Sequence, residues 1–425
     1  MNWAERDKKV IWHPYTQMLQ SEVIPIVKGD GAYLYDEAGN RYIDAISSWW
    51  VNTLGHANPY IAKKISEQLT TLEHVIFAGF THPKAVELAE RLLGHLPVNQ
   101  KKIFYSDNGS TAVEVALKMA IQFHSNQGLP NNTIIAFDNA YHGDTFGSMS
   151  VSGRSVFTHP FQPYLFDVKF IETPIKGKEE VAFNQLKETI NKGNITAFIF
   201  EPLVQGAAGM MMYEPEILDK MIQYCKSKQV ITIADEVMTG FYRTAKFFAT
   251  DYLNEKPDIY CLSKGITGGE MALGVTSCSQ MIFDVFLSED KTKTLYHGHS
   301  YTANPLACVA ALASLDLYEQ IECGENVKRI QEKHANFLQY IKHHKQIKDI
   351  RQTGTILTIE LNTKGVTSYL SEIRNKIYAY FIQKGIIMRP LGNIFYLIPP
   401  YCTSDSDLDY IYSCIEEFLN ELEVV

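Results

Sequence analysis

Short apolar runs alternate with helical patterns through most of this chain, and this alternation constrains its fold more than any other feature. From about Asn52 to Leu315, each run is followed by a polar or glycine-bearing turn and then by a helical pattern. The clearest runs are Ile103–Tyr105, Thr133–Phe137, Ile195–Phe200, Val230–Ala234 and Asp258–Leu262. Largely apolar runs suit strands buried on both faces, and their alternation with helices predicts a mostly parallel α/β sheet. Such sheets bind ligands at the carboxyl ends of their strands.

The same pattern divides the chain into a large unit and two flanking segments. Residues 52–315 form the predicted large domain, and residues 1–51 and 316–425 are expected to fold together as a small α+β domain. In the first segment, Gly31–Asp36 and Arg41–Ile46 predict a hairpin. The last segment has two strand-like runs and two helical patterns, at Thr355–Leu361, Asn393–Ile398, Ser368–Lys384 and from Ser404 onward.

Charge and cysteine content exclude several classes of function. The chain has 39 Lys and Arg against 48 Asp and Glu, a net charge of −9, and its basic residues are scattered. This argues against nucleic acid or an anionic membrane as the main partner. The first residues lack the apolar stretch of a signal peptide, and no run is long enough to span a membrane. Seven widely spaced cysteines without a CxxC pair indicate a reduced cytoplasmic protein, and no cluster has metal-ligand spacing, so no metal is expected.

Two of the predicted strands end directly in an ionisable residue. Ile231–Ala234 leads into Asp235, and Tyr260–Ser263 leads into Lys264. Parallel strands would bring this carboxylate and this amine to one edge of the sheet. Taken singly, each residue is explained by a structural role as well as by a functional one: it could belong to a buried ion pair or be a solvated strand end.

A third segment supplies a candidate phosphate site. The strand at Ile103–Tyr105 is followed by Asn108–Thr111 and then by a helix. Free backbone N–H groups and the positive end of the helix dipole would face a ligand above Gly109, which suits a phosphate. The same residues would also serve as an ordinary helix cap.

Together these features match the needs of pyridoxal phosphate. A lysine amine can bind the cofactor aldehyde, and an aspartate can keep the pyridine nitrogen protonated so that the ring accepts electrons. An aromatic side chain must also stack on the ring, and Tyr141, in the segment after Thr133–Phe137, is the candidate. A core or interface tyrosine is the alternative at that position.

Six motifs in order resemble the class III aminotransferases, which are fold type I pyridoxal phosphate enzymes. The motifs are Asn108–Ala112, Tyr141–Asp144, Glu201–Gly206, Ala234–Phe241, Leu262–Gly269 and His297–Pro305. The resemblance spans nearly the whole chain. It implies one large domain with a mostly parallel sheet and a small domain from the two ends of the chain.

Four further segments are similar to one branch of this class. They are His13–Thr16, Ser47–Trp50, Met388–Gly392 and Ile398–Tyr401. This likeness implies a ping-pong transfer of the amino group of S-adenosyl-L-methionine to 8-amino-7-oxononanoate in biotin biosynthesis. Two alternatives within the enzyme class stay open: lysine as donor, or another ω-aminotransferase acting on ornithine, 4-aminobutyrate or a diamine. A non-catalytic regulator built on this fold is a third, although no spare basic segment supports it.

The resemblance also assigns roles to individual residues. Lys264 becomes the Schiff-base lysine, Asp235 the partner of the pyridinium, Tyr141 the stacking residue and Tyr15 a further catalytic residue. Phosphate contacts come from Gly109 and Ser110 and, across a homodimer interface, from His299 and Ser300. Substrate contacts are expected from Tyr15, Trp49, Tyr141, Asp144, Arg243, Lys264, Gly298 and Arg389.

The substrates explain several of these residue types. A permanently charged arginine at 389 suits the acceptor's carboxylate, and Trp49 suits its methylenes. A sulfonium donor would suit aromatic faces and Asp144. The alternatives are core tryptophans and a surface ion pair.

Departures from the family pattern fall close to these residues. Tyr242 and Ala245 stand where the family usually has glycine, which leaves the pose of Arg243 open, and Gly269–Leu273 differs from the usual segment after the lysine. The stretch Phe157–Phe166 is expected to be a packed loop near the dimer interface with no part in binding ligands.

Overall fold

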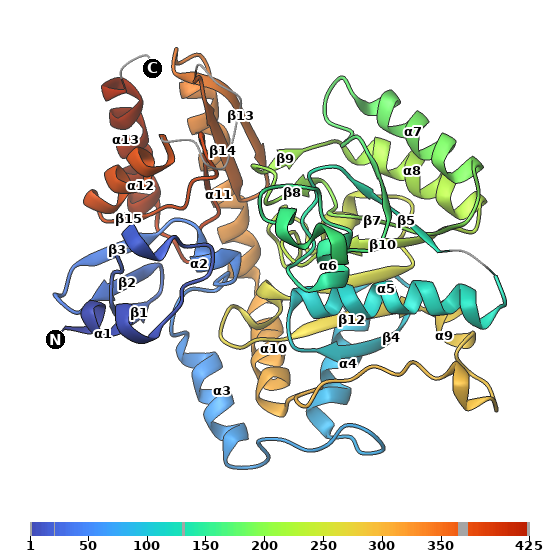
Figure 1. Cartoon of the computed structure of the whole chain (residues 1–425). Coiled ribbons are helices and arrows are strands. Elements are labelled where there is room, and N and C mark those ends of the chain that lie inside the picture. The colour runs from blue at the N-terminus through green and yellow to red at the C-terminus, as the bar shows by residue number, and fades with distance from the viewer. Residues whose placement is uncertain (1, 21, 130–131, 364–372, 423–425) are drawn as a thin grey trace.

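A seven-stranded sheet lies at the centre of the larger part of the molecule (Figure 1). The computed structural model describes residues 2–20, 22–129, 132–363 and 373–422. The spatial order of the strands is β4 (Gln100–Ser106), β12 (Gly274–Ser279), β11 (Ile259–Leu262), β10 (Ile231–Asp235), β7 (Ile195–Phe200), β5 (Thr133–Phe137) and β6 (Val168–Ile171). Neighbours from β11 to β6 pair in parallel. The five predicted strands and the mostly parallel sheet are therefore confirmed.

One strand of this sheet runs against the others. β12 pairs antiparallel with both β4 and β11. The polar side chains of β12 do not predict a buried strand, so this strand was not expected from the sequence. They find hydrogen-bond partners inside the protein: Thr276 donates to the carbonyl of Ala112 and Ser277 to the side chain of Gln100. Buried polar groups that find hydrogen-bond partners cost little, so this strand can be both polar and buried.

Helices cover both faces of the large sheet. One face carries α5 (Gly109–Asn126), whose apolar side chains share a core with β7, β10 and β11. The other face packs against α4 (Pro83–His95), α7 (Glu179–Asn191), α8 (Pro215–Ser227) and α10 (Pro305–Tyr318). α3 (Pro59–Leu69) lies against α10. Shorter elements are α1 (Trp3–Val10), α2 (Ser47–Trp50), α6 (Phe146–Ser150), α9 (Gln280–Asp284), β8 (Val204–Gln205) and β9 (Met211–Met212).

A second sheet joins the two ends of the chain. β1 (Ile26–Asp30), β2 (Tyr33–Asp36) and β3 (Arg41–Asp44) form an antiparallel meander, which confirms the predicted hairpin. β15 (Ile386–Ile387) then pairs with β3 in parallel. Figure 1 shows the first and last parts of the chain side by side for this reason.

The rest of the C-terminal region is a three-stranded sheet with helices. β13 (Ile347–Thr353), β14 (Ile356–Leu361) and β16 (Ile394–Leu397) are antiparallel, and the helices are α11 (Ile321–Ile341), α12 (Ile373–Gln383) and α13 (Asp405–Glu421). The two strand-like runs are thus confirmed as β14 and β16. The predicted helix at 368–384 is confirmed from Ile373; residues 368–372 lie outside the described part of the chain.

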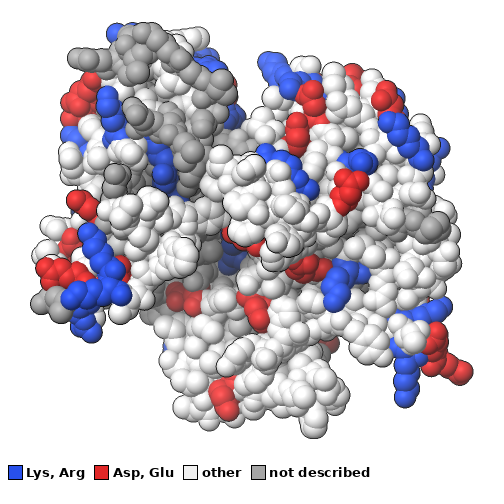
Figure 2. All heavy atoms as spheres, in the orientation of Figure 1, with Lys and Arg blue, Asp and Glu red and all other residues white. Residues whose placement is uncertain are grey.

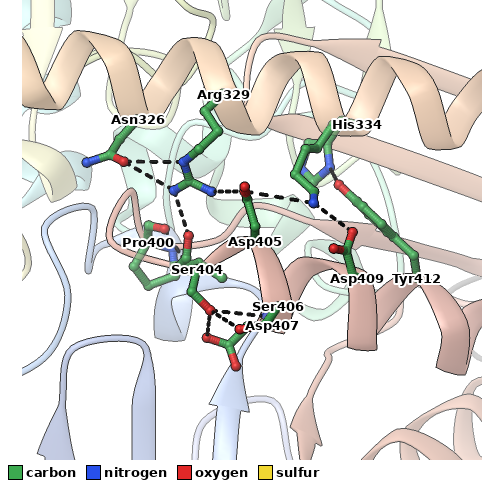
Figure 3. Close-up of polar contacts among 12 residues, drawn as sticks. Asn326, Arg329, His334, Pro400, Ser404, Asp405, Ser406, Asp407, Asp409 and Tyr412 are labelled. Atoms are coloured by element: carbon green, nitrogen blue, oxygen red, sulfur yellow. Dashed lines mark hydrogen bonds and ion pairs between the residues drawn. The ribbon is translucent and has the colours of Figure 1, made fainter.

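Polar contacts connect α11 to α13 (Figure 3). Arg329 pairs with Asp405 at 2.6 Å and Lys333 with Asp409 at 2.7 Å. Behind them, buried His334 shares a hydrogen bond of 2.6 Å with Tyr412. The side chain of Ser404 accepts from the N–H of Asp407, so the last helix begins where the sequence placed its cap.

The surface has no single charged face in the view of Figure 2, where basic and acidic side chains are interspersed. Across the described residues, no helix is long and apolar enough to cross a membrane.

Candidate active site

Asp235 and Lys264 meet at the carboxyl edge of the large sheet. Asp235 ends β10, and its register partner on the parallel strand β11 is Cys261, so Lys264 follows only three residues beyond that point. Both residues line a cavity of ≈ 360 Å³. Its other walls come from the segments after β4, β5 and β7, at Asn108–Ser110, Tyr141–Gly143 and Glu201. The cofactor-site residues predicted from the sequence within one chain therefore lie together at the carboxyl edge of the large sheet: Gly109, Ser110, Tyr141, Asp235 and Lys264.

Lys264 is held in an unusual backbone conformation. It has a φ of 49° and opens a short 3-10 helix, and its ammonium lies 4.6 Å from the centre of the Trp50 ring. Removal from bulk water lowers its pKa to about 8, against the opposing influence of Asp235 and Glu201. Near neutral pH, a lysine with this pKa has a much larger neutral fraction than an ordinary lysine, and the neutral amine can act as a nucleophile and a base.

His142 supports Asp235 and was missed as a site residue. Its Nδ1 lies 2.7 Å from Asp235 Oδ2, and both side chains are buried. The other oxygen of Asp235 accepts from the N–H of Val237 at 3.1 Å. In the sequence, His142 lies in the motif Tyr141–Asp144 but receives no role of its own, because nothing along the chain links it to a carboxylate on another strand.

The N-terminus of α5 forms a close-fitting cradle. Asn108 and Thr111 make a capping box, which leaves the first turn at Gly109 and Ser110 facing the cavity. A Cβ on Gly109 would lie 2.7 Å from Val237, and one on Gly143, whose φ is +132°, would lie 2.1 Å from Ser110 Oγ. Only glycine fits these two places, and the cradle's positive helix end suits a phosphate group.

Glu201 fixes the loop that carries Tyr141. Its carboxylate accepts from the N–H groups of Tyr141 and Gly206, at 3.0 and 2.9 Å. Burial raises the pKa of Glu201 to about 7. This acid appeared in a sequence motif without a role, and the structure shows that it orients the backbone of the candidate stacking residue.

A smaller cavity of ≈ 130 Å³ adjoins the first, and five of the eight predicted substrate residues line it: Tyr15, Trp49, Tyr141, Lys264 and Arg389. Trp49 and Arg389 lie in it because β3 and β15 are parallel neighbours, so the segments after them leave the sheet at the same edge. The guanidinium of Arg389 sits 4.4 Å from the centre of the Trp49 ring. Trp50, Tyr141 and Lys264 line both cavities, and Tyr15 lines the smaller one.

Phe157 also lines this smaller cavity. Its ring meets that of Tyr15 edge-on, with centroids 5.5 Å apart. The expectation that residues 157–166 have no part in a binding site needs correction at this residue. Proximity in the fold, not any local signal, reveals it.

Tyr15, Tyr141 and Asp144 form a polar cluster at the mouth of the site. The hydroxyls of Tyr15 and Tyr141 both donate to Asp144 Oδ2, at 2.5 and 3.0 Å. Burial, followed by these contacts, raises the pKa of Tyr141 well above its usual range. Tyr141 therefore stays neutral near neutral pH and donates its hydroxyl hydrogen to Asp144.

Arg243 lies behind the site. Its guanidinium donates to the backbone carbonyls of Pro399, at 2.9 Å, and of Trp50, at 3.4 Å, and it lies 5.2 Å from the Tyr401 ring centre. It is 1% exposed and is absent from the described lining of the two cavities. Near it, Tyr242 and Ala245 both have a φ of +71°, a conformation that glycine adopts more easily than residues with a side chain.

The remaining segments lie beside and outside the main cavity. Gly269 and Met271–Leu273 line its wall, and Glu270 turns away to accept from the N–H of Asn58 at 3.2 Å. Gly298 and Ser300 are exposed, and His299 contacts Asp107 at 2.9 Å. These last three residues do not line either of the two described cavities.

A mixed sheet whose carboxyl edge presents a lysine, an aspartate and a phosphate cradle defines a fold type I pyridoxal phosphate enzyme. The family model for aminotransferase class III matches residues 15–419. The chain belongs to the class III aminotransferases.

Relatives and solved structures agree with this assignment. The chain is 44% identical to the adenosylmethionine-8-amino-7-oxononanoate aminotransferase of Synechococcus elongatus, over 97% of this chain and 99% of the relative. The crystal structure of the protein with that name from Methanocaldococcus jannaschii superposes with a TM-score of 0.94 at 36% identity, covering 99% of each chain. An amine transaminase from an uncultivated Pseudomonas species, solved in its PLP-bound form, gives 0.92 at 28% identity over 97% of this chain and 99% of the other.

The residues around the main cavity fit pyridoxal 5′-phosphate. Gly109, Ser110 and Gly143 leave room for a phosphate at a helix N-terminus. Asp235 and Lys264 offer the carboxylate and the amine that the ring and aldehyde need. No group of described residues could hold a metal ion.

Proposed function

We propose that this enzyme transfers the amino group of S-adenosyl-L-methionine to 8-amino-7-oxononanoate, giving 7,8-diaminononanoate for biotin biosynthesis. When bound, pyridoxal phosphate supplies the carbonyl that carries the amino group between the two substrates and the ring that withdraws electrons from the reacting carbon. The proposal is supported by the relatives named above and by the substrate cavity.

Lys264 is the proposed covalent anchor and proton carrier. With a pKa of about 8, the free amine would take the proton from the donor Cα and deliver it to the cofactor carbon that has gained the nitrogen; in the second half-reaction it would move a proton the other way, to the acceptor carbon. Asp235, with His142 behind it, would hold the ring nitrogen of the cofactor.

The stacking of Arg389 on Trp49 is the single observation that favours this acceptor. The guanidinium matches a carboxylate in charge and planar shape, and the indole face offers apolar surface to a methylene chain. An acceptor with a terminal carboxylate on a long apolar chain would use both.

The cluster of Tyr15, Tyr141 and Asp144 is the proposed site for the donor. Two phenol rings and a carboxylate stabilise a cation such as a sulfonium, by cation–π attraction and by charge. Both tyrosines also border Lys264 in the smaller cavity, which brings a donor held there to the reacting amine.

A half-reaction assay tests the proposal. The cofactor-loaded enzyme is mixed with each donor separately, and the cofactor's visible absorption is followed. We expect S-adenosyl-L-methionine to remove this absorption and 8-amino-7-oxononanoate to restore it. A response to lysine but not to S-adenosyl-L-methionine would show that lysine is the amino donor. A response only to ornithine or 4-aminobutyrate would refute the proposal.

We also propose that a second copy of the chain completes each site through Gly298, His299 and Ser300. These residues are exposed or half-buried and are absent from the linings of the two described cavities. Mixing a Lys264→Ala chain with a His299→Ala/Ser300→Ala chain tests this, because a hybrid dimer would contain one unaltered site. Recovery of activity supports sharing, whereas additive residual rates contradict it.

Two further expectations remain proposals. We propose that residues 52–315 form the large cofactor-binding domain and that residues 1–51 and 316–425 form the small one. We also propose that the enzyme works in the cytoplasm, which the seven unpaired cysteines support.

A further inference from the structure

The segment that carries the two active-site tryptophans is strained. Ser47, Ser48 and Trp50 have φ values of 51°, 56° and 66°, all in the region that residues other than glycine rarely adopt. Strained backbone of this kind persists only where the surroundings hold it in place, and it concentrates at functional sites. Some group in the structure must therefore hold this segment.

Asp44 bonds the backbone of this segment directly. It ends β3 and is fully buried, and its Oδ2 accepts from the N–H of Ser48 at 2.6 Å. Its Oδ1 accepts from the N–H of Ile46 at 3.2 Å. A single carboxylate thus bonds the backbone on both sides of the first strained residue.

His56 holds Asp44 in turn. Its Nε2 lies 2.8 Å from Asp44 Oδ2. Its own backbone is fixed by a pair of hydrogen bonds with Gly31, of 2.7 and 3.1 Å. A Cβ added to Gly29 would lie 2.7 Å from the His56 Cβ, so the histidine has little freedom to move away.

The tryptophans that follow face the reaction site. Trp49 lies under Arg389, and Trp50 lies beside Lys264. The other supports of this segment bond the hydroxyl of Ser47 and the side chain and carbonyl of Trp50. Ser47 donates to the carbonyl of Ile398 at 2.7 Å, the indole of Trp50 donates to Tyr396, and Arg243 donates to the carbonyl of Trp50. Among the described contacts, only those of Asp44 reach the N–H groups that precede and follow Ser47.

We propose that Asp44 and His56 are positioning residues for the aminotransferase reaction. Their contact holds residues 46–50, in which Ser47, Ser48 and Trp50 have positive φ, in the conformation that places Trp49 on Arg389 and Trp50 beside Lys264. Neither touches the cavities among the described residues, so they act only through the two tryptophans.

Asp44→Asn and His56→Leu test this role, with Asp36→Asn as the matched control. Asp36 is also a buried aspartate that ends a strand of the same sheet, and its carboxylate accepts from the N–H groups of Ala38 and Asn40. Its turn leads to no site residue. A general loss of stability would therefore appear in all three variants. A positioning effect would appear in Asp44→Asn and His56→Leu but not in Asp36→Asn.

The kinetic readout uses the cofactor-loaded enzyme and rests on the proposed function. We expect Asp44→Asn and His56→Leu to raise the KM for 8-amino-7-oxononanoate about tenfold or more, since small misplacements at a site are costly. Cofactor content should stay full, and Asp36→Asn should leave KM unchanged. Equal KM changes in the control, or none in His56→Leu, would overturn the proposal.

A spectroscopic readout is independent of the substrates. The chain has four tryptophans, and Trp3 and Trp12 are exposed. In a Trp3→Phe/Trp12→Phe background, the near-ultraviolet circular dichroism of tryptophan comes only from Trp49 and Trp50. Loss of that signal in Asp44→Asn and His56→Leu, but not in Asp36→Asn, is expected. An unchanged signal overturns the proposal, whereas failure of the unaltered enzyme to convert the acceptor refutes only the proposed function.

Discussion

The guanidinium of Arg389 lies 4.4 Å from the centre of the Trp49 ring, although these residues come from opposite ends of the chain. Their meeting depends on β3 and β15, two short strands that pair in parallel in the sheet shared by both termini. The substrate cavity thus depends on a sheet that contains neither the lysine nor the phosphate cradle.

Arg389→Met should weaken the acceptor selectively. Hydrogen bonds to charged groups contribute about 1.5–3 kcal/mol, so the acceptor KM should rise roughly ten- to a hundredfold. The half-reaction with the donor should change little, because the donor is assigned to the Asp144 cluster. Steady-state kinetics with each substrate varied in turn measure this.

Arg41→Met is the control for that change. Arg41 also lies over an aromatic ring, 4.6 Å from the centre of Tyr33, on the same sheet but outside the two cavities. Its KM values should equal those of the unaltered enzyme. A similar acceptor defect in both variants would contradict a carboxylate site at Arg389.

Lys264→Ala should abolish turnover while cofactor remains bound through the phosphate cradle. The amine that anchors the cofactor and moves the proton is lost, but Gly109 and Ser110 are untouched. Rate assays and cofactor content after gel filtration measure the two effects. Lys256→Ala, which removes an ammonium bonded to the carbonyls of Thr250 and Leu253, should keep its turnover.

Lys264 should also give the cofactor-free enzyme a specific pH dependence. Burial lowers the pKa of this lysine from 10.5 to about 8, so the unfolded chain holds the proton more tightly than the folded one. The free energy of unfolding therefore rises with pH between about 8 and 10.5. Lys264→Met should be the more stable protein at pH 7, and this advantage should shrink across that window.

Thermal unfolding of both cofactor-free proteins over this pH range measures the difference. Other groups titrate equally in the two proteins and cancel when the curves are subtracted. A difference in stability that does not vary with pH would show that Lys264 keeps its ordinary pKa in the folded chain.

Gly143→Ala should weaken cofactor binding. The added methyl would lie 2.1 Å from Ser110 Oγ and displace it from the cradle. Loss of one charge-assisted hydrogen bond corresponds to a cofactor dissociation constant raised about tenfold or more. Gly193→Ala shares the positive φ, at +87°, but its methyl meets nothing within 4 Å, so it should bind cofactor normally. Fluorescence titration of both cofactor-free variants compares them.

Much of the fold could be predicted because buried parallel strands can be recognised in a sequence as short, largely apolar runs. Thr133–Phe137 and Ile195–Phe200 are of this kind and appear as β5 and β7. β12 could not be found this way, since its Thr276 and Ser277 satisfy their hydroxyls through residues far along the chain. His142 and Phe157 were missed as site residues for the same reason: their partners, Asp235 and Tyr15, lie on other segments.

The sequence by itself determined the chemistry of this protein: a lysine and an aspartate at strand ends, a glycine before a helix, and motifs that name a family. These are local features, fixed by residue type and short spacing. Only the tertiary structure decided how the substrate cavity is built. The parallel pairing of β3 and β15 joins opposite ends of the chain, and the contact of His56 with Asp44 depends on how the chain folds back between these two residues. No spacing along the chain encodes them.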